Sequence, residues 1–295
     1  MQQQAVELTE GPQGQALIRL HGPCGSRVEV YQYGGHITSW ICKDGREMLY
    51  MSPTAALDGS KAIRGGIPVC FPQFGLHGPL KQHGFARNTT WALVDPEDAE
   101  EDDGEEEGIS PRVQLVLTDS AQTRQSEWPH KFKVVQTIAL DKDGSLVQKM
   151  DVCNTGNTPF EFSIALHAYL AVPNSSEAII RGLGGLLFAD SVRDGVESTQ
   201  ALDFVKFGEE VDRLYYASSD NISIPSAGIE LHKENLPDIV IWNPHVQKAA
   251  ALADMPDDDW ERFICVEPAR VKEKACVQPG EIWSASLVLT STVEE

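Results

Sequence analysis

Alternation of apolar and polar residues runs through most of this chain. Residues 112–118 place Val113, Leu115 and Leu117 at every second position, and residues 132–140 repeat the pattern. Successive side chains of a β-strand point to opposite faces, so this period of two predicts strands with one face in a core. Strands are expected on the same grounds over 27–32, 37–42, 48–51, 145–152, 160–170, 239–242, 263–267 and 282–290.

Tight turns separate these strands. The residues 141–144, Asp-Lys-Asp-Gly, predict a hairpin, and the chain holds 24 glycines and 17 prolines. Long helical periodicity is nearly absent, and one short helix is expected over 248–253. The chain is therefore predicted to be all-β, a large antiparallel β-sandwich or barrel with few short helices. No linker rich in Pro, Gly or Ser divides it, so a single domain over 1–295 is expected.

The chain is acidic, with 24 Lys and Arg against 44 Asp and Glu and a formal net charge of −20. Ten of the thirteen residues 95–107 are acidic, and a mobile acidic loop is expected at about 95–109. Nucleic acids and anionic membranes are bound by clustered Lys and Arg, which the sequence lacks, so neither is an expected partner. No apolar run approaches the roughly 18 residues of a membrane span, and the first residues do not resemble a targeting segment. A cytoplasmic location is expected.

Several common catalytic motifs are missing. The sequence contains no GxSxG, GxxxxGK, GxGxxG or HExxH pattern, which argues against serine hydrolases, P-loop proteins, dinucleotide enzymes and zincins. Its six cysteines are scattered without CxxC or CxxH pairs, so their spacing indicates neither a zinc site nor a disulfide framework. Reduced, mostly buried thiols are expected.

Two arginines lie in stretches rich in glycine and proline. Arg64 and Arg87, with Gln82 and His83 close to the second, could form a receptor for an oxyanion. A guanidinium fork matches phosphate or carboxylate with two parallel hydrogen bonds, which favours this interpretation. The alternative is that both arginines pair with structural carboxylates and the glycines only make turns.

A histidine and a glutamate are the candidate acid and base. The alternation places His167 on the non-core face of its strand, and Glu267 ends a wholly apolar strand just before Pro268, which is expected to end the ladder. Imidazole titrates near neutrality, and burial or a nearby charge moves the pKa of a carboxyl group toward or away from that range. The alternatives are a structural histidine and a glutamate paired with Arg270 or another cation.

Eight short motifs follow one another along nearly the whole chain. They are Arg64-Gly-Gly-Ile-Pro68 with Phe71-Pro-Gln-Phe-Gly75, His83-Gly-Phe-Ala-Arg87, Trp128-Pro129 before Phe132, Asn154-Thr-Gly156, Leu166-His-Ala-Tyr169, Val211-Asp-Arg213, Trp242-Asn-Pro244 and Cys265-Val-Glu-Pro268. In this order they resemble the aldose 1-epimerase superfamily, specifically its glucose-6-phosphate 1-epimerase branch of hexose-phosphate mutarotases. The acidic segment belongs to none of these motifs.

The resemblance implies a galactose mutarotase-like β-sandwich, or supersandwich, whose concave face binds a hexose without a metal or organic cofactor. It also implies that His167 is the catalytic acid and Glu267 the catalytic base. Substrate-binding positions are matched by five residues: Arg64, Gln82, His83, Arg87 and Asp212.

The expected reaction interconverts α and β anomers at C1 of a hexose. A proton leaves O1 while another reaches the ring oxygen O5, the ring opens, and it closes on the other face after rotation about C1–C2. A carboxylate and an imidazole on opposite sides of the sugar ring would supply the two proton transfers.

The arginines indicate the substrate class. A 6-phosphate dianion gains from paired guanidinium groups in a protein of net charge −20, which favours glucose 6-phosphate and related hexose 6-phosphates. A mutarotase for free aldoses and a non-catalytic sugar-phosphate sensor are the alternatives. We expect a monomer whose partner is this small molecule.

Overall fold

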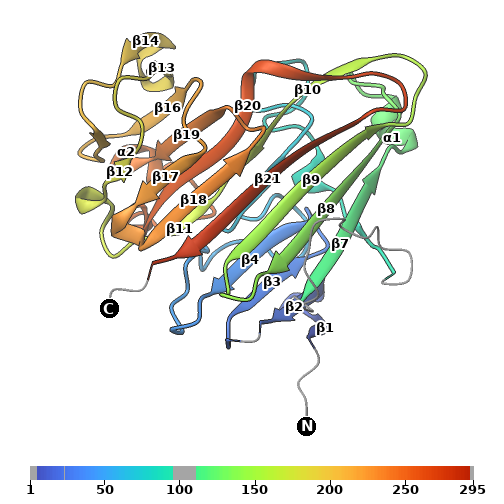
Figure 1. Cartoon of the computed structure of the whole chain (residues 1–295), viewed down its shortest axis with the longest axis horizontal. Helices are drawn as coiled ribbons and strands as arrows, with labels where there is room; N and C mark the ends of the chain where they lie inside the picture. Colours follow the sequence, from blue (N-terminus) through green and yellow to red (C-terminus); the bar gives the residue numbers. More distant parts are fainter. Residues whose placement is uncertain (1–4, 23, 96–110, 293–295) are drawn as a thin grey trace.

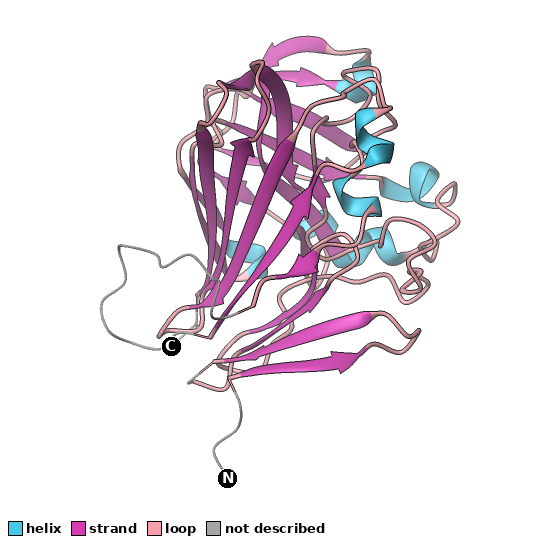
Figure 2. Cartoon of the chain, turned by 90° about the vertical axis from the view of Figure 1, so that its right-hand side faces the viewer, coloured by secondary structure: helices cyan, strands magenta, loops and turns pink. Residues whose placement is uncertain are grey.

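The computed structural model describes residues 5–22, 24–95 and 111–292. An acidic loop was predicted at about 95–109. Only its first residue, Asp95, belongs to the described part of the chain, and the rest of the loop lies outside it. The described part of the chain forms three sheets built from antiparallel strand pairs, and most of the short helical segments lie on one side of them (Figure 2). None of the described helices has the length and apolar character needed to cross a membrane.

Strands that are neighbours in a sheet are often distant in the chain. From one edge to the other, the four-stranded sheet contains β1 (Val6–Glu10), β2 (Ala16–His21), β3 (Arg27–Tyr31) and β4 (His36–Ile41). The eight-stranded sheet contains β14 (Val196–Thr199), β13 (Leu187–Asp190), β16 (Val211–Tyr215), β19 (Asp238–Asn243), β20 (Phe263–Val277), β10 (Phe160–Leu166) and β5 (Val69–Cys70), with β11 (Tyr169–Ala171) also beside β20. The nine-stranded sheet contains β15 (Phe204–Val205), β12 (Ile180–Arg181), β17 (Asn221–Ile224), β18 (Ile229–Glu234), β21 (Ile282–Ser291), β9 (Leu146–Asn154), β8 (Phe132–Leu140), β7 (Arg112–Thr118) and β6 (Ala92–Leu93).

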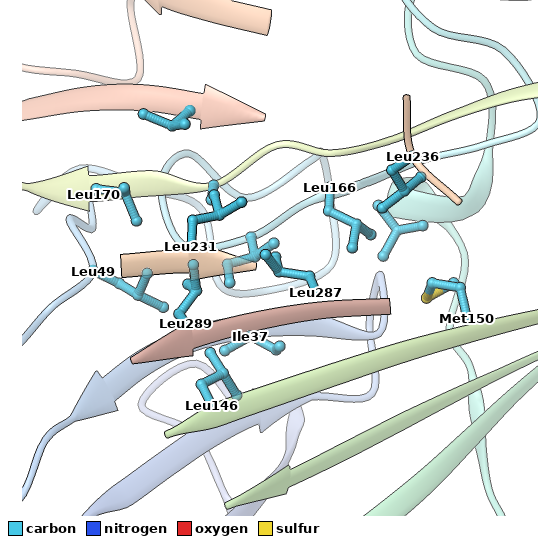
Figure 3. Close-up of a cluster of buried hydrophobic side chains, with 14 of the residues drawn as sticks. Ile37, Leu49, Leu146, Met150, Leu166, Leu170, Leu231, Leu236, Leu287 and Leu289 are labelled. Atoms are coloured by element: carbon cyan, nitrogen blue, oxygen red, sulfur yellow. The ribbon is translucent and has the colours of Figure 1, made fainter. Parts of the chain in front are cut away.

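All three sheets contribute to the main hydrophobic core. Figure 3 shows Leu166 and Leu170 of the eight-stranded sheet near Leu287 and Leu289 of the nine-stranded sheet, with Ile37 of β4 beside them. Each of these side chains is almost fully buried. Burial of one such side chain contributes about 1.5 to 3 kcal/mol, so this shared core holds the sheets together.

The predicted hairpin is confirmed. β8 and β9 pair along their whole length, and Figure 1 shows them beside β7 and β21 as long neighbouring strands. The carboxylate of Asp141 accepts the N–H groups of Asp143 and Ser145, at 2.9 and 2.8 Å, and so closes the turn. Gly144 has a φ of 83°, which favours glycine at this position.

The predicted alternation over 160–170 is confirmed, although the strand is interrupted. Phe162 and Leu166 of β10 belong to the main core, whereas Ala165 and Tyr169 belong to clusters on the other face of the sheet. The chain leaves the sheet after Leu166 and returns to it at Tyr169 as β11. The sheet is therefore covered on both faces, and His167 lies in the interruption.

The prediction that Pro268 ends its strand is wrong. β20 continues past it, with Ile239 of β19 opposite the proline. On the other side of β20, the N–H of Val266 donates to the carbonyl of Ala168. Because backbone N–H groups alternate sides along a strand, the missing N–H of Pro268 falls on that side, where β10 has ended and β11 begins. The proline therefore removes no hydrogen bond between β20 and β19.

The helix predicted over 248–253 begins and ends earlier. α2 covers His245–Ala249, and the Asn243 side chain accepts the His245 N–H at 3.0 Å, which starts the helix after Pro244. The remaining α-helix of the described residues, α1 (Ala121–Arg124), was not predicted.

The alternation also did not predict β1, β2 or the strands from β12 to β18. These strands are two to six residues long. The single-domain organisation over 1–295 stays a prediction.

Replacement of Phe162 by alanine tests the aromatic part of the core. Phe162 is 1% exposed and contacts the rings of Phe71, Phe160 and Trp283. We expect Phe162→Ala to lower the free energy of unfolding by about 3 to 5 kcal/mol in urea denaturation, because it leaves a cavity. The exposed Leu202 gives the control, since Leu202→Ala removes no core contact and should change stability by less than about 0.5 kcal/mol. Equal losses in both variants would contradict this account.

Candidate active site

A cavity of about 500 Å³ brings together all seven residues that the sequence singled out. They are His167, Glu267, Arg64, Gln82, His83, Arg87 and Asp212. Residues without a predicted role also line it, among them Phe74, His77, Ser191, Trp242 and Lys248. A volume of this size is typical of a small-molecule site.

Strand alternation places one side of this cavity on the eight-stranded sheet. Asp212 of β16 is opposite Trp242 of β19, and Glu267 follows on the next strand, β20. Their neighbours Ile241 and Val266 point the other way, into the main core. Because side chains alternate between faces, the same pattern that builds the core presents the polar residues to the cavity.

The glycine-rich segment after Arg64 holds His167 in place. The N–H of His167 donates to the Pro68 carbonyl at 3.0 Å, and the N–H of Tyr169 donates to the Gly66 carbonyl at 2.9 Å. Gly66 has a φ of 61°, and a Cβ there would lie 2.1 Å from the Ile37 carbonyl oxygen. Only glycine therefore allows this segment to lie so close to β4 while its backbone binds that of His167 and Tyr169.

Aromatic rings fix the His167 imidazole. Its ring is stacked on Tyr169, with centroids 4.8 Å apart and planes at 7°, and the Trp242 ring meets it edge-on at 5.9 Å. The ring of His83 lies 5.7 Å away. These contacts leave the imidazole little freedom to rotate.

His167 and Glu267 are direct neighbours. The Nδ1 of His167 lies 3.3 Å from the Oε1 of Glu267, and the residues are 8% and 1% exposed. Neither Nδ1 of His167 nor Oε2 of Glu267 has a hydrogen-bond partner among the described residues. A sugar ring does not fit in a 3.3 Å gap, so the expectation that the two groups face each other across the sugar is wrong. Both groups face the cavity from the same side.

Burial favours the uncharged form of both groups. It raises the pKa of Glu267 well above the ordinary value, an effect strengthened by Asp212 and opposed by Arg87. It lowers the pKa of His167 well below the ordinary value, and His83, Arg87 and Arg64 act in the same direction. Both shifts favour the state in which Glu267 carries the proton and His167 is a neutral imidazole.

His83 is held as a neutral imidazole. Its Nδ1 accepts the Gly75 N–H at 3.3 Å, which leaves the proton of the neutral ring on Nε2. Burial, assisted by Arg87 and Arg64, lowers the pKa of His83 to about 3. His83 also has a φ of 66°, uncommon outside glycine, so a specific loop conformation places it in the cavity.

Arg64 is paired with a structural carboxylate, as the alternative interpretation anticipated. Its Nε and one terminal nitrogen donate to the two carboxylate oxygens of Asp254, at 3.1 and 3.4 Å. The other terminal nitrogen donates to the Tyr169 hydroxyl at 3.1 Å. Arg64 thus links Asp254 to the ring that stacks on His167.

Arg87 has a different environment. One of its terminal nitrogens donates to the Gln82 carbonyl at 3.1 Å, and its buried Nε has no hydrogen-bond partner in the described part of the chain. Within residues 5–22, 24–95 and 111–292, no carboxylate lies within ion-pair distance of this guanidinium. Of the two cavity arginines, Arg87 is therefore the one whose positive charge is not balanced by a neighbouring carboxylate of the described residues.

A third cation lies on the Asp212 side of the cavity. The ammonium group of Lys248, on α2, contacts Glu210 at 2.7 Å and Asp212 at 3.9 Å. Burial raises the pKa of Asp212, and Lys248 opposes that change. Sequence reasoning missed Lys248 because an isolated lysine on a short helix has no local signal. Trp242 was part of a motif but had received no role.

Three buried residues, two of which line the cavity, have donor atoms suited to a metal ion. His167, Cys265 and Glu267 each offer one such atom, and all three atoms lie within 4.8 Å of one another. Cys265 and Glu267 are two residues apart on β20, so their side chains leave the sheet on the same face.

The family model for aldose 1-epimerases matches residues 16–290. The chain belongs to the aldose 1-epimerase family. A protein of Cenchrus ciliaris is 35% identical over 97% of this chain and 88% of its own length. One of Escherichia coli K12 is 32% identical over 81% of this chain and 78% of its own length. Both are named "Putative glucose-6-phosphate 1-epimerase".

Solved structures of mutarotase-like proteins share the fold. The crystal structure of a candidate mutarotase from Salmonella typhimurium superimposes with a TM-score of 0.82 at 25% identity, covering 99% of this chain and 95% of that one. A galactose mutarotase-like protein from Clostridium acetobutylicum gives a TM-score of 0.68 at 17% identity, covering 97% of each chain. The predicted family and the all-β, mutarotase-like architecture are confirmed.

The raised pKa of Glu267 makes stability depend on pH. The unfolded chain releases this proton near pH 4.5, before the folded epimerase does, so folding becomes less favourable as pH rises from there to the folded pKa. The slope is at most about 1.4 kcal/mol per pH unit. Glu267→Gln keeps a neutral side chain, so urea denaturation should show it gaining stability relative to the wild type toward neutral pH.

A matched control comes from the exposed carboxylate of Glu161. Glu161→Gln should follow the wild-type pH profile. A stability difference between wild type and Glu267→Gln that stays constant from pH 4.5 to neutrality would show that Glu267 ionises normally.

Proposed function

We propose that this protein interconverts the α and β anomers at C1 of glucose 6-phosphate and related hexose 6-phosphates. The observation that carries the proposal is the buried contact between His167 and Glu267 in a cavity that also contains Arg87. The names of the two relatives agree with this substrate.

The pair contains the proton that the chemistry needs. With Glu267 as base and His167 as acid, the reactive form is a carboxylate beside an imidazolium, which has the same proton count as the neutral pair. Transfer of one proton across the 3.3 Å contact therefore produces it without exchange with solvent. Each group contributes about 10² to 10⁴ in rate as a general acid or base.

The position of the pair on one side of the substrate agrees with the geometry of a hexose. O1 and the ring oxygen O5 are both bonded to C1, so two adjacent protein groups can reach them together. Glu267 takes the proton from O1 while His167 protonates O5. After rotation about C1–C2 the roles reverse and the ring closes on the other face.

Arg87 supports a phosphorylated substrate. Its guanidinium lacks a carboxylate partner among the described residues. A phosphate dianion would supply an anionic partner through charge-assisted hydrogen bonds. Arg64 is already committed to Asp254 and Tyr169, so we assign it chiefly to positioning. Gln82, His83 and Asp212 are proposed to contact the sugar. The cytoplasmic location and the monomeric state also stay predictions.

Removal of either member of the pair should abolish most of the catalysis. We expect His167→Ala and Glu267→Gln each to lower the anomer exchange rate of glucose 6-phosphate by about 10² to 10⁴, measured by exchange NMR. His232 and Glu161 lie on the surface, so His232→Ala and Glu161→Gln are controls expected to retain the wild-type rate. Exchange no faster than in buffer, or full activity in both site variants, would refute the assignment.

Arg87→Ala separates phosphorylated from free hexoses. Loss of one charge-assisted contact of about 1.5 to 3 kcal/mol should raise KM for glucose 6-phosphate by roughly 10- to 100-fold and leave exchange of free glucose unchanged. Arg124 lies on α1 outside the cavity, and Arg124→Ala is the control. Equal rates on both sugars, unaffected by Arg87→Ala, would instead favour a mutarotase for free aldoses. Binding without exchange would favour a sugar-phosphate sensor.

A further inference from the structure

We propose that His167, Cys265 and Glu267 form an inhibitory site for a borderline divalent cation such as Zn²⁺. The imidazole, thiolate and carboxylate would each provide one ligand atom. Bound metal would occupy the same acid and base that the proposed reaction uses. The inhibition therefore rests on the proposed function, whereas the binding does not.

The spacing of the three ligand atoms is close to what zinc requires. Zinc takes nitrogen at about 2.0 to 2.1 Å, carboxylate oxygen at 2.0 to 2.2 Å and sulfur at 2.3 Å in tetrahedral sites, so neighbouring ligand atoms lie roughly 3.3 to 3.6 Å apart. Nδ1 of His167 and Oε1 of Glu267 are already 3.3 Å apart. The sulfur of Cys265 completes a set within 4.8 Å, which small side-chain rotations can tighten.

Two of the ligand groups present unpartnered atoms. Nδ1 of His167 and Oε2 of Glu267 are buried without a hydrogen-bond partner from any described residue, although such atoms are normally satisfied. A metal ion would satisfy both groups at once. This observation is independent of the clustering of the three residues and points to a ligand at the same place.

The donor set and its charge favour a borderline cation. Sulfur and imidazole nitrogen suit Zn²⁺, whereas Mg²⁺ prefers oxygen ligands. One thiolate and one carboxylate neutralise the two charges of the ion, so the complex places no net charge near Arg64 and Arg87. Burial of Cys265 raises the pKa of its thiol well above the ordinary value, which adds a cost of deprotonation and argues for reversible binding.

The fourth coordination position would face the cavity. His167 and Glu267 both line it, and the described residues supply three ligands, so water or a sugar hydroxyl could complete a tetrahedron. This arrangement differs from a closed structural site. Chelators should therefore remove the ion and restore the free acid and base.

Cobalt spectroscopy tests the site without reference to activity. Co²⁺ added to the metal-free full-length protein should give the visible bands of a tetrahedral complex and a near-ultraviolet thiolate-to-metal band. Cys265→Ser should lose the thiolate band and weaken Zn²⁺ binding, measured by calorimetry, by at least about 10-fold. The exposed Cys276 provides the matched control, and Cys276→Ser should bind as the wild type does. Glu267→Gln, which keeps the thiol, gives a second variant with weakened binding.

Anomer exchange NMR tests the inhibition. Zn²⁺ should inhibit the wild type, EDTA should restore the rate, Mg²⁺ at the same concentration should have no effect, and Cys265→Ser should require at least about 10-fold more Zn²⁺. Equal inhibition of Cys265→Ser and wild type, or a cobalt complex without a thiolate band, would overturn the proposal. If the protein lacks epimerase activity, calorimetry and the cobalt spectrum still decide whether the metal site exists.

Discussion

The burial of a carboxyl group beside an imidazole is the constraint on which the rest of the site depends. Glu267 lies inside β20 and is 1% exposed, so an isolated charge there would be expensive. Burial favours the uncharged forms of both Glu267 and the neighbouring His167, whose Nδ1 lies 3.3 Å from the carboxyl group. The same burial that disfavours ionisation strengthens the electrostatic interactions of any charge that develops when a substrate draws the proton away.

The cations around the cavity differ in whether they already have a partner within the protein. Arg64 is tied to Asp254 and Tyr169, and Lys248 is tied to Glu210, so both shape the site. Arg87 lacks such a partner among the described residues and is the cation that can respond to an anion. This division explains how a protein of net charge −20 can present a positive position to a dianionic sugar.

Local pattern predicted part of this arrangement, and pairing between distant segments decided the rest. Alternation placed His167 on the non-core face, because the period of two depends only on neighbouring residues. It did not reveal that Arg64 pairs with Asp254, 190 positions away, or that Pro268 lies inside a strand. Those outcomes depend on which strands become neighbours. The motif order supplied the family and the seven cavity residues, but it did not reveal Lys248.

By itself, the sequence determined an all-β fold, its longer strands, and the residue types of an acid–base site, because these follow from periodicity, turn residues and ordered motifs. Only the tertiary structure decided that His167 and Glu267 touch, that Cys265 lies beside them, and that Arg87 lacks a carboxylate partner among the described residues. The physical reason is that contacts between side chains depend on distances of a few ångströms between segments about a hundred residues apart. Sheet register sets these distances, and local pattern does not.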